Sequence, residues 1–199
     1  TVRAWDYAVE LQMPRMAFIN KMDVDGADFF GTIERMRELF GKGIMPLQIP
    51  IGEGADFEGV VDVAKMTAFT YKDGQPTEVA VPAHLIEKAQ EIREMTVEAA
   101  AEGSDELLEK YLEGEELSLE EIRQGLREGM ITGRVCPIMC GSATSRIGLD
   151  QVLDRMIRYM PDAAKKVMTA ESADTGEPVV VHVDKPLTAF VFKTLLDPF

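Results

Sequence analysis

The chain lacks the features that mark membrane, secreted or nucleic-acid-binding proteins. None of its apolar stretches reaches the roughly 18 uncharged residues that a transmembrane helix needs. Its first residues show no basic region followed by an apolar run, so no signal peptide is predicted. Its 21 basic side chains face 35 acidic ones, and a net charge of -14 disfavours nucleic-acid binding without a local basic patch. No such patch occurs, so we expect no membrane contact and no direct, sequence-specific nucleic-acid binding.

Cysteine and histidine are also scarce. The two cysteines, Cys136 and Cys140, lie in one apolar run, and residues four apart in a strand point to the same face. We predict two buried thiols, because a zinc site needs two more ligands and His84 and His182 lie far away in sequence. Unpaired thiols suit a reducing compartment, which together with the missing signal predicts a cytoplasmic protein.

The remaining composition is that of a packed globular protein, with 46% apolar and 28% charged residues. Residues 16–19 and 135–140 form continuous apolar runs between polar residues, the pattern of strands buried on both faces of a parallel sheet. Pro137 removes one backbone donor and predicts a strand start or a bulge there. Apolar residues at helical spacing follow each run, over residues 29–40 and 149–159. The pattern predicts an α/β fold with a parallel sheet.

The segment between these two units has a different character. Alternation over residues 47–51 predicts a strand, and residues 60–63 and 66–71 add one or two more. Apolar stripes then predict three helices, the third of which begins at a capping box formed by Ser118 and Glu121. The helices are expected between Pro82 and Gly103, between Ser104 and Gly114, and between Ser118 and Gly133.

A polar stretch follows the last of these helical patterns. Residues 162–185 are mixed and polar, which predicts a linker with one short strand at 179–183. Residues 186–193 alternate between the two faces of a strand and suggest the start of a further domain, truncated at Phe199.

Each of the two buried strands ends in a short polar motif. Asn20-Lys21-Met22-Asp23 follows the first strand, and Gly141-Ser142-Ala143 follows the second. Ligands of open parallel sheets bind at the carboxyl ends of the strands. We therefore expect the two motifs to meet in space and to form one ligand site.

The residue types of the two motifs suit guanine. The Asp23 carboxylate can accept hydrogen bonds from both the ring N–H and the exocyclic amino group, a donor pair that adenine lacks. The stem of Lys21 can lie over the base, and Asn20 can donate and accept bonds that join the two loops. The backbone N–H of Ala143 can donate to the guanine oxygen, because its small side chain leaves room for the base.

The phosphate-binding counterpart of such a site is missing from the sequence. No Gly-x-x-x-x-Gly-Lys-Ser/Thr motif occurs, so neither the phosphate-binding lysine nor the magnesium-binding hydroxyl is present. We expect a chain that is the second half of a nucleotide-binding domain, hydrolyses no GTP alone and binds it weakly. Two other acidic patterns, a magnesium-switch match at residues 23–26 and a calcium-loop match at residues 23–28, have the wrong context and are interpreted as chance.

Longer segments resemble bacterial translation elongation factor G. They are residues 14–23, 26–29, 48–52, 59–62, 107–114 and 140–143. Residues 186–193 look like the start of that family's second, barrel domain. The resemblance implies an α/β fold: an incomplete P-loop-GTPase-type parallel sheet with an inserted α+β subdomain and the start of a β-barrel.

The resemblance also implies a domain arrangement. Residues 1–46 and 134–165 correspond to the C-terminal half of the GTP-binding domain, and residues 47–133 to the inserted subdomain. Residues 166–185 correspond to a linker, and residues 186–199 to the first strand of the barrel. The insertion accounts for the long separation of the two motifs, since a βαβ unit needs only about 30 residues.

The function implied by the resemblance is GTP-driven movement of tRNA and mRNA through the ribosome. Asn20, Lys21 and Asp23 would contact guanine and ribose, with GTP or GDP as ligand. In the Gly141-Ser142-Ala143 binding motif, Ser142 and Ala143 would contact the base oxygen. Mg²⁺ would bind only in the absent N-terminal part. The expected partners are the ribosome and its stalk protein.

The inserted subdomain carries an acidic stripe. In the family this subdomain meets the stalk protein, and here one helix has four acidic residues spaced by four, three and four positions. They are Glu87, Glu91, Glu94 and Glu98. A simple solvated helix face explains the same pattern, so both interpretations stay open.

The sequence departs from the family at two places. Residues 144–147 read Thr-Ser-Arg-Ile where the family has an aromatic residue and lysines, and the linker at 165–185 is unusual. A divergent paralogue, such as a ribosome-protection factor or a GTP-dependent release factor, is therefore an alternative. A module that only binds through its acidic insert is a further alternative of a different class.

Overall fold

The computed structural model of the chain describes residues 2–162, 168–181, 189, 191 and 194. It divides into two compact units, residues 1–160 and 161–199. Apart from residues 189 and 191, the strand predicted at 186–193 lies outside the described residues.

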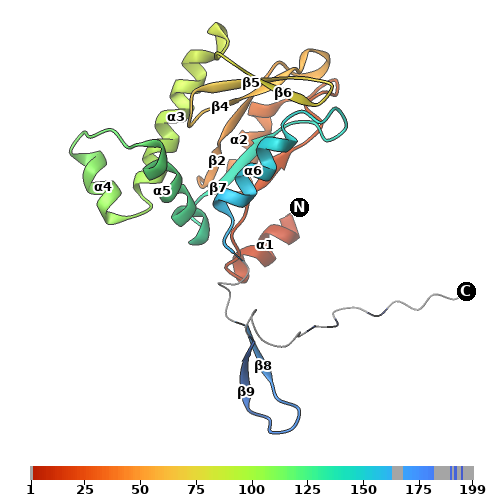
Figure 1. The fold of residues 1–199 in the computed structure, drawn as a ribbon, viewed down its shortest axis with the longest axis vertical. Coiled ribbons are helices and arrows are strands. Elements are labelled where there is room, and N and C mark those ends of the chain that lie inside the picture. The colour runs from red at the N-terminus through yellow and green to blue at the C-terminus, as the bar shows by residue number, and fades with distance from the viewer. Residues whose placement is uncertain (1, 163–167, 182–188, 190, 192–193, 195–199) are drawn as a thin grey trace, which may run out of the picture. The chain divides into compact units, whose positions relative to one another are not determined.

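The first unit contains a three-stranded parallel sheet (Figure 1). Its strands are β1 (Ala17–Ile19), β7 (Cys136–Cys140) and β2 (Ile44–Pro46), in the order β1-β7-β2. The helices beside it are α1 (Val2–Glu10), α2 (Phe29–Phe40) and α6 (Leu149–Tyr159). Both strand pairs are parallel, which confirms the predicted α/β fold with a parallel sheet.

Burial of the first strand differs from the prediction. All three residues of β1 are only half-buried, whereas every residue of β7 is buried. The central strand β7 is covered on both sides, and the edge strand β2 is buried because α2 and α3 also contact it, whereas β1 is an edge strand of the described sheet that pairs only with β7. The short strand β2 was not predicted, because its three apolar residues run directly into the next strand without a turn signal.

Pro137 lies at the second position of the central strand. The backbone N–H of Cys136 donates to Gly43 O at 2.7 Å, and Ile138 O accepts from Leu47 N at 3.0 Å, so both neighbours bond toward β2. The backbone of Pro137 therefore faces β1, where pairing begins only at Ala17. The missing donor falls just outside the paired region, which agrees with the predicted strand start.

An antiparallel meander forms the second sheet. Its strands are β3 (Gln48–Ile51), β4 (Gly59–Asp62), β5 (Thr67–Lys72) and β6 (Gln75–Val79), in that order. Asp73 and Gly74 join β5 to β6 with φ of 53° and 77°, as a two-residue hairpin requires. The exposed, polar strand β6 was not predicted, because it buries no side chain that would leave a pattern.

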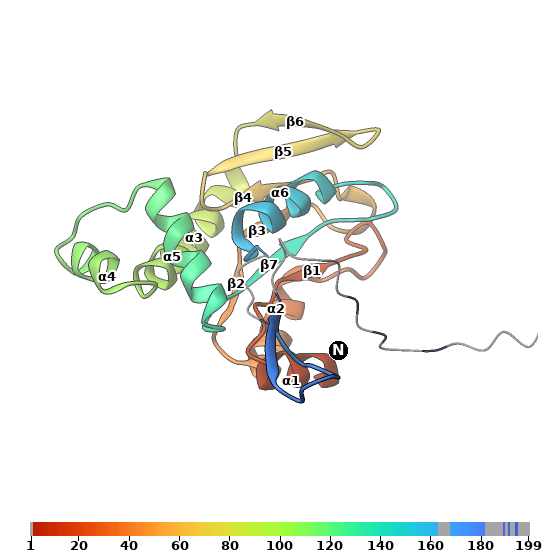
Figure 2. The ribbon, with the colours of Figure 1, turned by 60° about the horizontal axis from the view of Figure 1, so that its bottom comes forward.

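Three longer helices follow the meander. They are α3 (Ile86–Ala101), α4 (Asp105–Leu112) and α5 (Leu119–Ile131), and short 3₁₀ turns occur at Gly54–Asp56 and Ala83–Leu85. The predicted capping box is confirmed, since Ser118 and Glu121 bond to each other's backbone N–H groups. The three helices lie together on one side of the sheets (Figure 1; Figure 2).

One apolar core joins the two sheets. Ile138 and Cys140 of β7 belong to the same buried cluster as Ile49 of β3 and Val60 of β4. A second cluster holds α5 through Ile122, Leu126 and Met130, together with buried residues of α3 and β7. The meander is therefore packed firmly against the parallel sheet through shared side chains.

The second unit contains a small hairpin. Strand β8 (Met168–Glu171) pairs antiparallel with β9 (Pro178–Val181). The sequence predicted only one strand here, at 179–183. Its partner β8 is exposed at all four positions, so no apolar alternation marked it.

A candidate nucleobase site at the ends of β1 and β7

The two polar motifs leave the parallel sheet side by side. Ile19 and Cys140 are register partners, so the next residue of each strand lies at the same edge. Gly141 N donates to Ile19 O at 3.0 Å, and Met22 N donates to Gly141 O at 3.1 Å. These bonds extend the pairing of the strands into the loops and bring together the motifs that the sequence singled out.

A side-chain hydrogen bond joins the motifs directly. The Ala143 N–H donates to Asn20 Oδ1 at 2.9 Å, across 123 positions of sequence. This is the role that the sequence assigned to Asn20, a link between the loops. The same N–H was assigned to the guanine oxygen, so a bound base must share this hydrogen bond or replace it.

The first motif is a turn with one buried and three outward residues. Met22 is 1% exposed and anchors the turn, whereas Asn20 and Lys21 are exposed and Asp23 is half-buried. Lys21 takes φ of 64°, and Val24 N donates to Lys21 O at 3.2 Å. In the described part of the chain, the side chains of Lys21 and Asp23 form no ion pair or hydrogen bond, and both are available to a ligand.

The second motif begins a loop whose two ends are joined by hydrogen bonds. Ser142 and Ile147 exchange two backbone hydrogen bonds of 3.0 Å each, and Ser142 Oγ accepts from Ser145 N at 3.2 Å. A Cβ at Gly141 would lie 2.3 Å from Ile147 O, so this position excludes any larger residue. Ser142 is 1% exposed, whereas Ala143 is exposed. Ser142 shapes the loop, and Ala143 presents its backbone at the surface.

The loop between β3 and β4 supports the first motif, and no pattern in the sequence predicts this support. Gly54 N donates to Met22 O at 2.8 Å, and Glu53 Oε1 accepts from Phe29 N at 3.0 Å at the start of α2. Each of these long-range contacts has a backbone group, Met22 O or Phe29 N, as the partner in the first motif or α2. Any residue supplies such a group, so the sequence contains no matching pair of side chains that would reveal the contacts.

The two cysteines are buried and free, as predicted. Burial raises the pKa of Cys136 to about 11 and raises that of Cys140 further. Both thiols therefore stay protonated at neutral pH and behave as core side chains. Within the described ranges, no three His, Cys, Asp or Glu residues are grouped as metal ligands, and His182 lies outside those ranges.

The acidic stripe lies on α3, on a different element from the two motifs. Its four members, Glu87, Glu91, Glu94 and Glu98, are all exposed. Lys88 Nζ pairs with Glu91 Oε2 at 2.8 Å and neutralises part of the stripe. Among the described helices, none has both the length and the apolar character needed to cross a bilayer.

Comparison with known proteins shows the family of the chain. A crystal structure of a protein from Thermus thermophilus is similar to this chain, with a TM-score of 0.74 and 34% sequence identity. The similarity covers 80% of this chain and 24% of the Thermus chain, so this chain spans about a quarter of that protein's length. Residues 1–162 match the family described as the elongation factor Tu GTP binding domain. The chain thus belongs to the GTP-binding domain family of the translational GTPases.

Proposed function

We propose that this chain is the guanine-reading part of a translational GTPase of the elongation factor G type. Asn20, Lys21, Asp23 and the Gly141–Ala143 loop would bind the base and ribose of GTP or GDP. The observation that carries this proposal is the 2.9 Å bond between Ala143 N and Asn20 Oδ1, which places both predicted motifs at one edge of the sheet.

The free side chains of the first motif support guanine as the base. The Asp23 carboxylate forms no ion pair in the described part of the chain. A carboxylate that accepts from two adjacent N–H donors forms charge-assisted hydrogen bonds, which are stronger than those of a neutral acceptor. Rejection of adenine follows, because adenine would leave the carboxylate without the donor pair. Lys21 is exposed next to it and can cover one face of the base with its methylene groups.

An open strand edge and an apolar groove support a longer parent protein. β1 pairs only with β7 in the described sheet, and beside it lies a groove of about 460 Å³. The groove is lined mainly by apolar residues, Ala4, Trp5, Ala8, Pro14, Arg15, Met16, Ala17, Phe18, Val152, Met156 and Met160. We propose that the phosphate-binding half of the domain pairs with β1 and covers this groove. That half would supply the phosphate loop, the Mg²⁺ site and GTP hydrolysis.

The proposed parent drives translocation of tRNA and mRNA on the ribosome in the cytoplasm. In it, residues 1–46 and 134–165 are the second half of the GTP-binding domain, and residues 47–133 are the inserted subdomain. Residues 166–185 are a linker to a barrel domain that begins at 186–199. The shared core of the two sheets supports an insert that moves together with the base-reading loops.

The base-reading role is tested by calorimetric titration of the chain with GDP and with ADP. We expect GDP to bind with a Kd on the order of 1 mM, about −4 kcal/mol, because the phosphate contacts are missing. We expect no binding of ADP and no hydrolysis of GTP. Equal binding of the two nucleotides would contradict guanine reading, and nanomolar binding of GDP would contradict the absence of a phosphate-binding half.

The stalk-binding role of the acidic stripe is tested by charge reversal. The double variant Glu91→Lys/Glu94→Lys is expected to weaken binding of a ribosomal stalk protein at least tenfold, because two attractive contacts become repulsive. Glu34→Lys/Glu38→Lys makes the same charge change on exposed positions of α2 and serves as the control. Surface plasmon resonance at two salt concentrations measures the effect. If both double variants bind the stalk protein equally, the stripe is only a solvated helix face.

A further inference from the structure

The turn between β5 and β6 contacts the loop that follows β7. Arg146 Nη2 donates to the backbone oxygen of Asp73 at 3.1 Å. A Cβ at Gly74 would lie 3.0 to 3.2 Å from atoms of the Arg146 side chain, so the side chain lies directly against the turn. Arg146 belongs to the segment where the sequence departs from its family, and the base-reading motifs alone give it no role.

A second contact holds the start of the following helix. Tyr71 of β5 donates its hydroxyl to Asp150 Oδ1 at 2.6 Å, and Gln151 Nε2 donates to Asp150 Oδ2 at 2.9 Å. Burial, and then the bond to Asp150, raise the pKa of Tyr71. The phenol therefore remains a donor across the physiological range. The β5–β6 hairpin thus holds the loop at Arg146 and again just beyond it, at Asp150.

A continuous series of contacts leads from the hairpin to the base site. Arg146 takes φ of 60°, a conformation that costs free energy in a non-glycine residue unless other contacts hold it. Its neighbour Ile147 exchanges two backbone bonds with Ser142. Ser142 precedes Ala143, whose N–H donates to Asn20 Oδ1. Moving Arg146 therefore moves the backbone that presents the Ala143 N–H.

We propose that Tyr71 and Arg146 are positioning residues, through which the β5–β6 hairpin holds the 142–148 loop in its base-accepting conformation. The identity of the ligand as a guanine nucleotide rests on the proposed function, whereas the contacts between the hairpin and the loop are those of the structure. When the loop has its base-accepting conformation in only a fraction of the molecules, the apparent Kd equals the intrinsic Kd divided by that fraction. By the same linkage, a partner that displaces the hairpin weakens guanine binding.

The experiment compares Arg146→Ala and Tyr71→Phe with the unaltered chain. Amide hydrogen exchange at Ser142, Ala143 and Ile147 reports the loop, and titration with GDP reports the site. Each variant loses one hydrogen bond. We therefore expect the exchange rate of the loop amides and the Kd for GDP each to rise roughly three- to tenfold. Exchange in β3 and β4 should not change. Arg146→Lys, which keeps a cationic donor, should restore most of both values.

Arg158→Ala is the matched control, because Arg158 is an exposed α6 residue that pairs with Asp154 on its own helix. Its loop exchange and GDP affinity should equal those of the unaltered chain. Loop exchange that stays unchanged in both test variants would overturn the inference, and so would faster exchange with an unchanged Kd. If the unaltered chain binds no GDP but the variants exchange faster, the hairpin's positioning role stands and the proposed ligand fails.

Discussion

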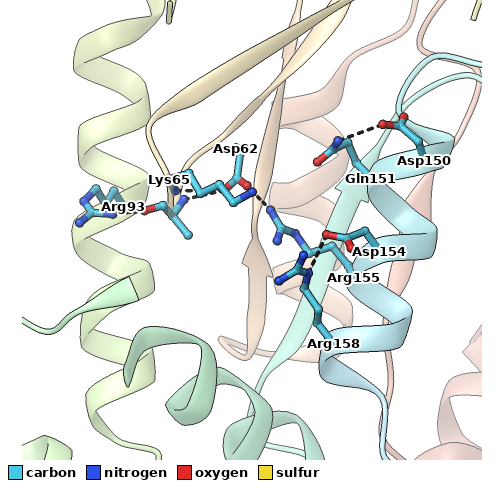
Figure 3. Close-up of polar contacts among 9 residues, drawn as sticks. Asp62, Lys65, Arg93, Asp150, Gln151, Asp154, Arg155 and Arg158 are labelled. Carbon is cyan, nitrogen blue, oxygen red and sulfur yellow. Dashed lines mark hydrogen bonds and ion pairs between the residues drawn. The ribbon is translucent and has the colours of Figure 1, made fainter. Parts of the chain in front are cut away.

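Replacing Arg155 with Met is expected to lower the free energy of unfolding by about 3–5 kcal/mol, because it leaves a buried carboxylate without its counter-ion. Arg155 of α6 is 2% exposed and pairs with Asp62 of β4, which is fully buried (Figure 3). Asp62 Oδ1 also accepts from Ala64 N and Lys65 N, each at 3.1 Å, so it cannot turn toward water without losing those bonds. The ion pair therefore holds the meander against α6.

Urea unfolding at neutral pH measures this effect. Arg158→Met is the matched control, since Arg158 pairs with Asp154 four residues earlier on the exposed side of the same helix. Its expected cost is only about 0.3–0.5 kcal/mol. Adding Asp62→Asn to Arg155→Met should recover part of the loss, because the amide oxygen still accepts the backbone bonds and carries no charge. Equal midpoints for Arg155→Met and Arg158→Met would contradict the structural role of the buried pair.

Replacing Asp23 with Asn is expected to remove detectable GDP binding and to create binding of xanthosine diphosphate. Each charge-assisted hydrogen bond contributes roughly 1.5–3 kcal/mol, so losing one weakens binding more than tenfold. The amide of Asn also presents a donor to the guanine amino group, which is itself a donor. Xanthine carries an oxygen at that position and can accept this hydrogen bond.

Competition calorimetry with the two diphosphates measures the switch. Asp25→Asn is the control, since Asp25 is exposed two residues further along the same turn and was assigned no contact with the base. It should keep GDP binding and gain no binding of xanthosine diphosphate. Unchanged GDP affinity in Asp23→Asn would show that Asp23 does not read the base.

The sequence predicted the parallel sheet and the meeting of the two motifs because both depend on local patterns. Buried strands leave continuous apolar runs, and polar residues directly after them mark the ligand edge of the sheet. The capping box at Ser118 was equally predictable, since its two residues lie three positions apart. The half-burial of β1 could not be predicted, because a strand's position in the sheet depends on its neighbours and not on its own residues.

The supporting contacts of the site could not be predicted for a related reason. Arg146 bonds to a backbone oxygen 73 positions away, and Gly54 bonds to the backbone of Met22. Neither contact needs a particular partner side chain, so the sequence contains no matching pair to find. The buried pair of Asp62 and Arg155 joins residues 93 positions apart, and an isolated Asp and Arg are normally surface residues. Only the packing of the meander on α6 brings them together.

We propose that the loops after β1 and β7 form one guanine-binding surface. Amide NMR of the ¹⁵N-labelled chain, titrated with guanosine monophosphate and then with adenosine monophosphate, tests it most directly. We expect guanosine monophosphate to shift the amide signals of Ala143, of the Asn20 side chain and of the Lys21 to Asp23 backbone together, along one binding curve. Adenosine monophosphate should leave them unchanged. Shifts confined to one loop, or equal shifts with both nucleotides, would contradict it.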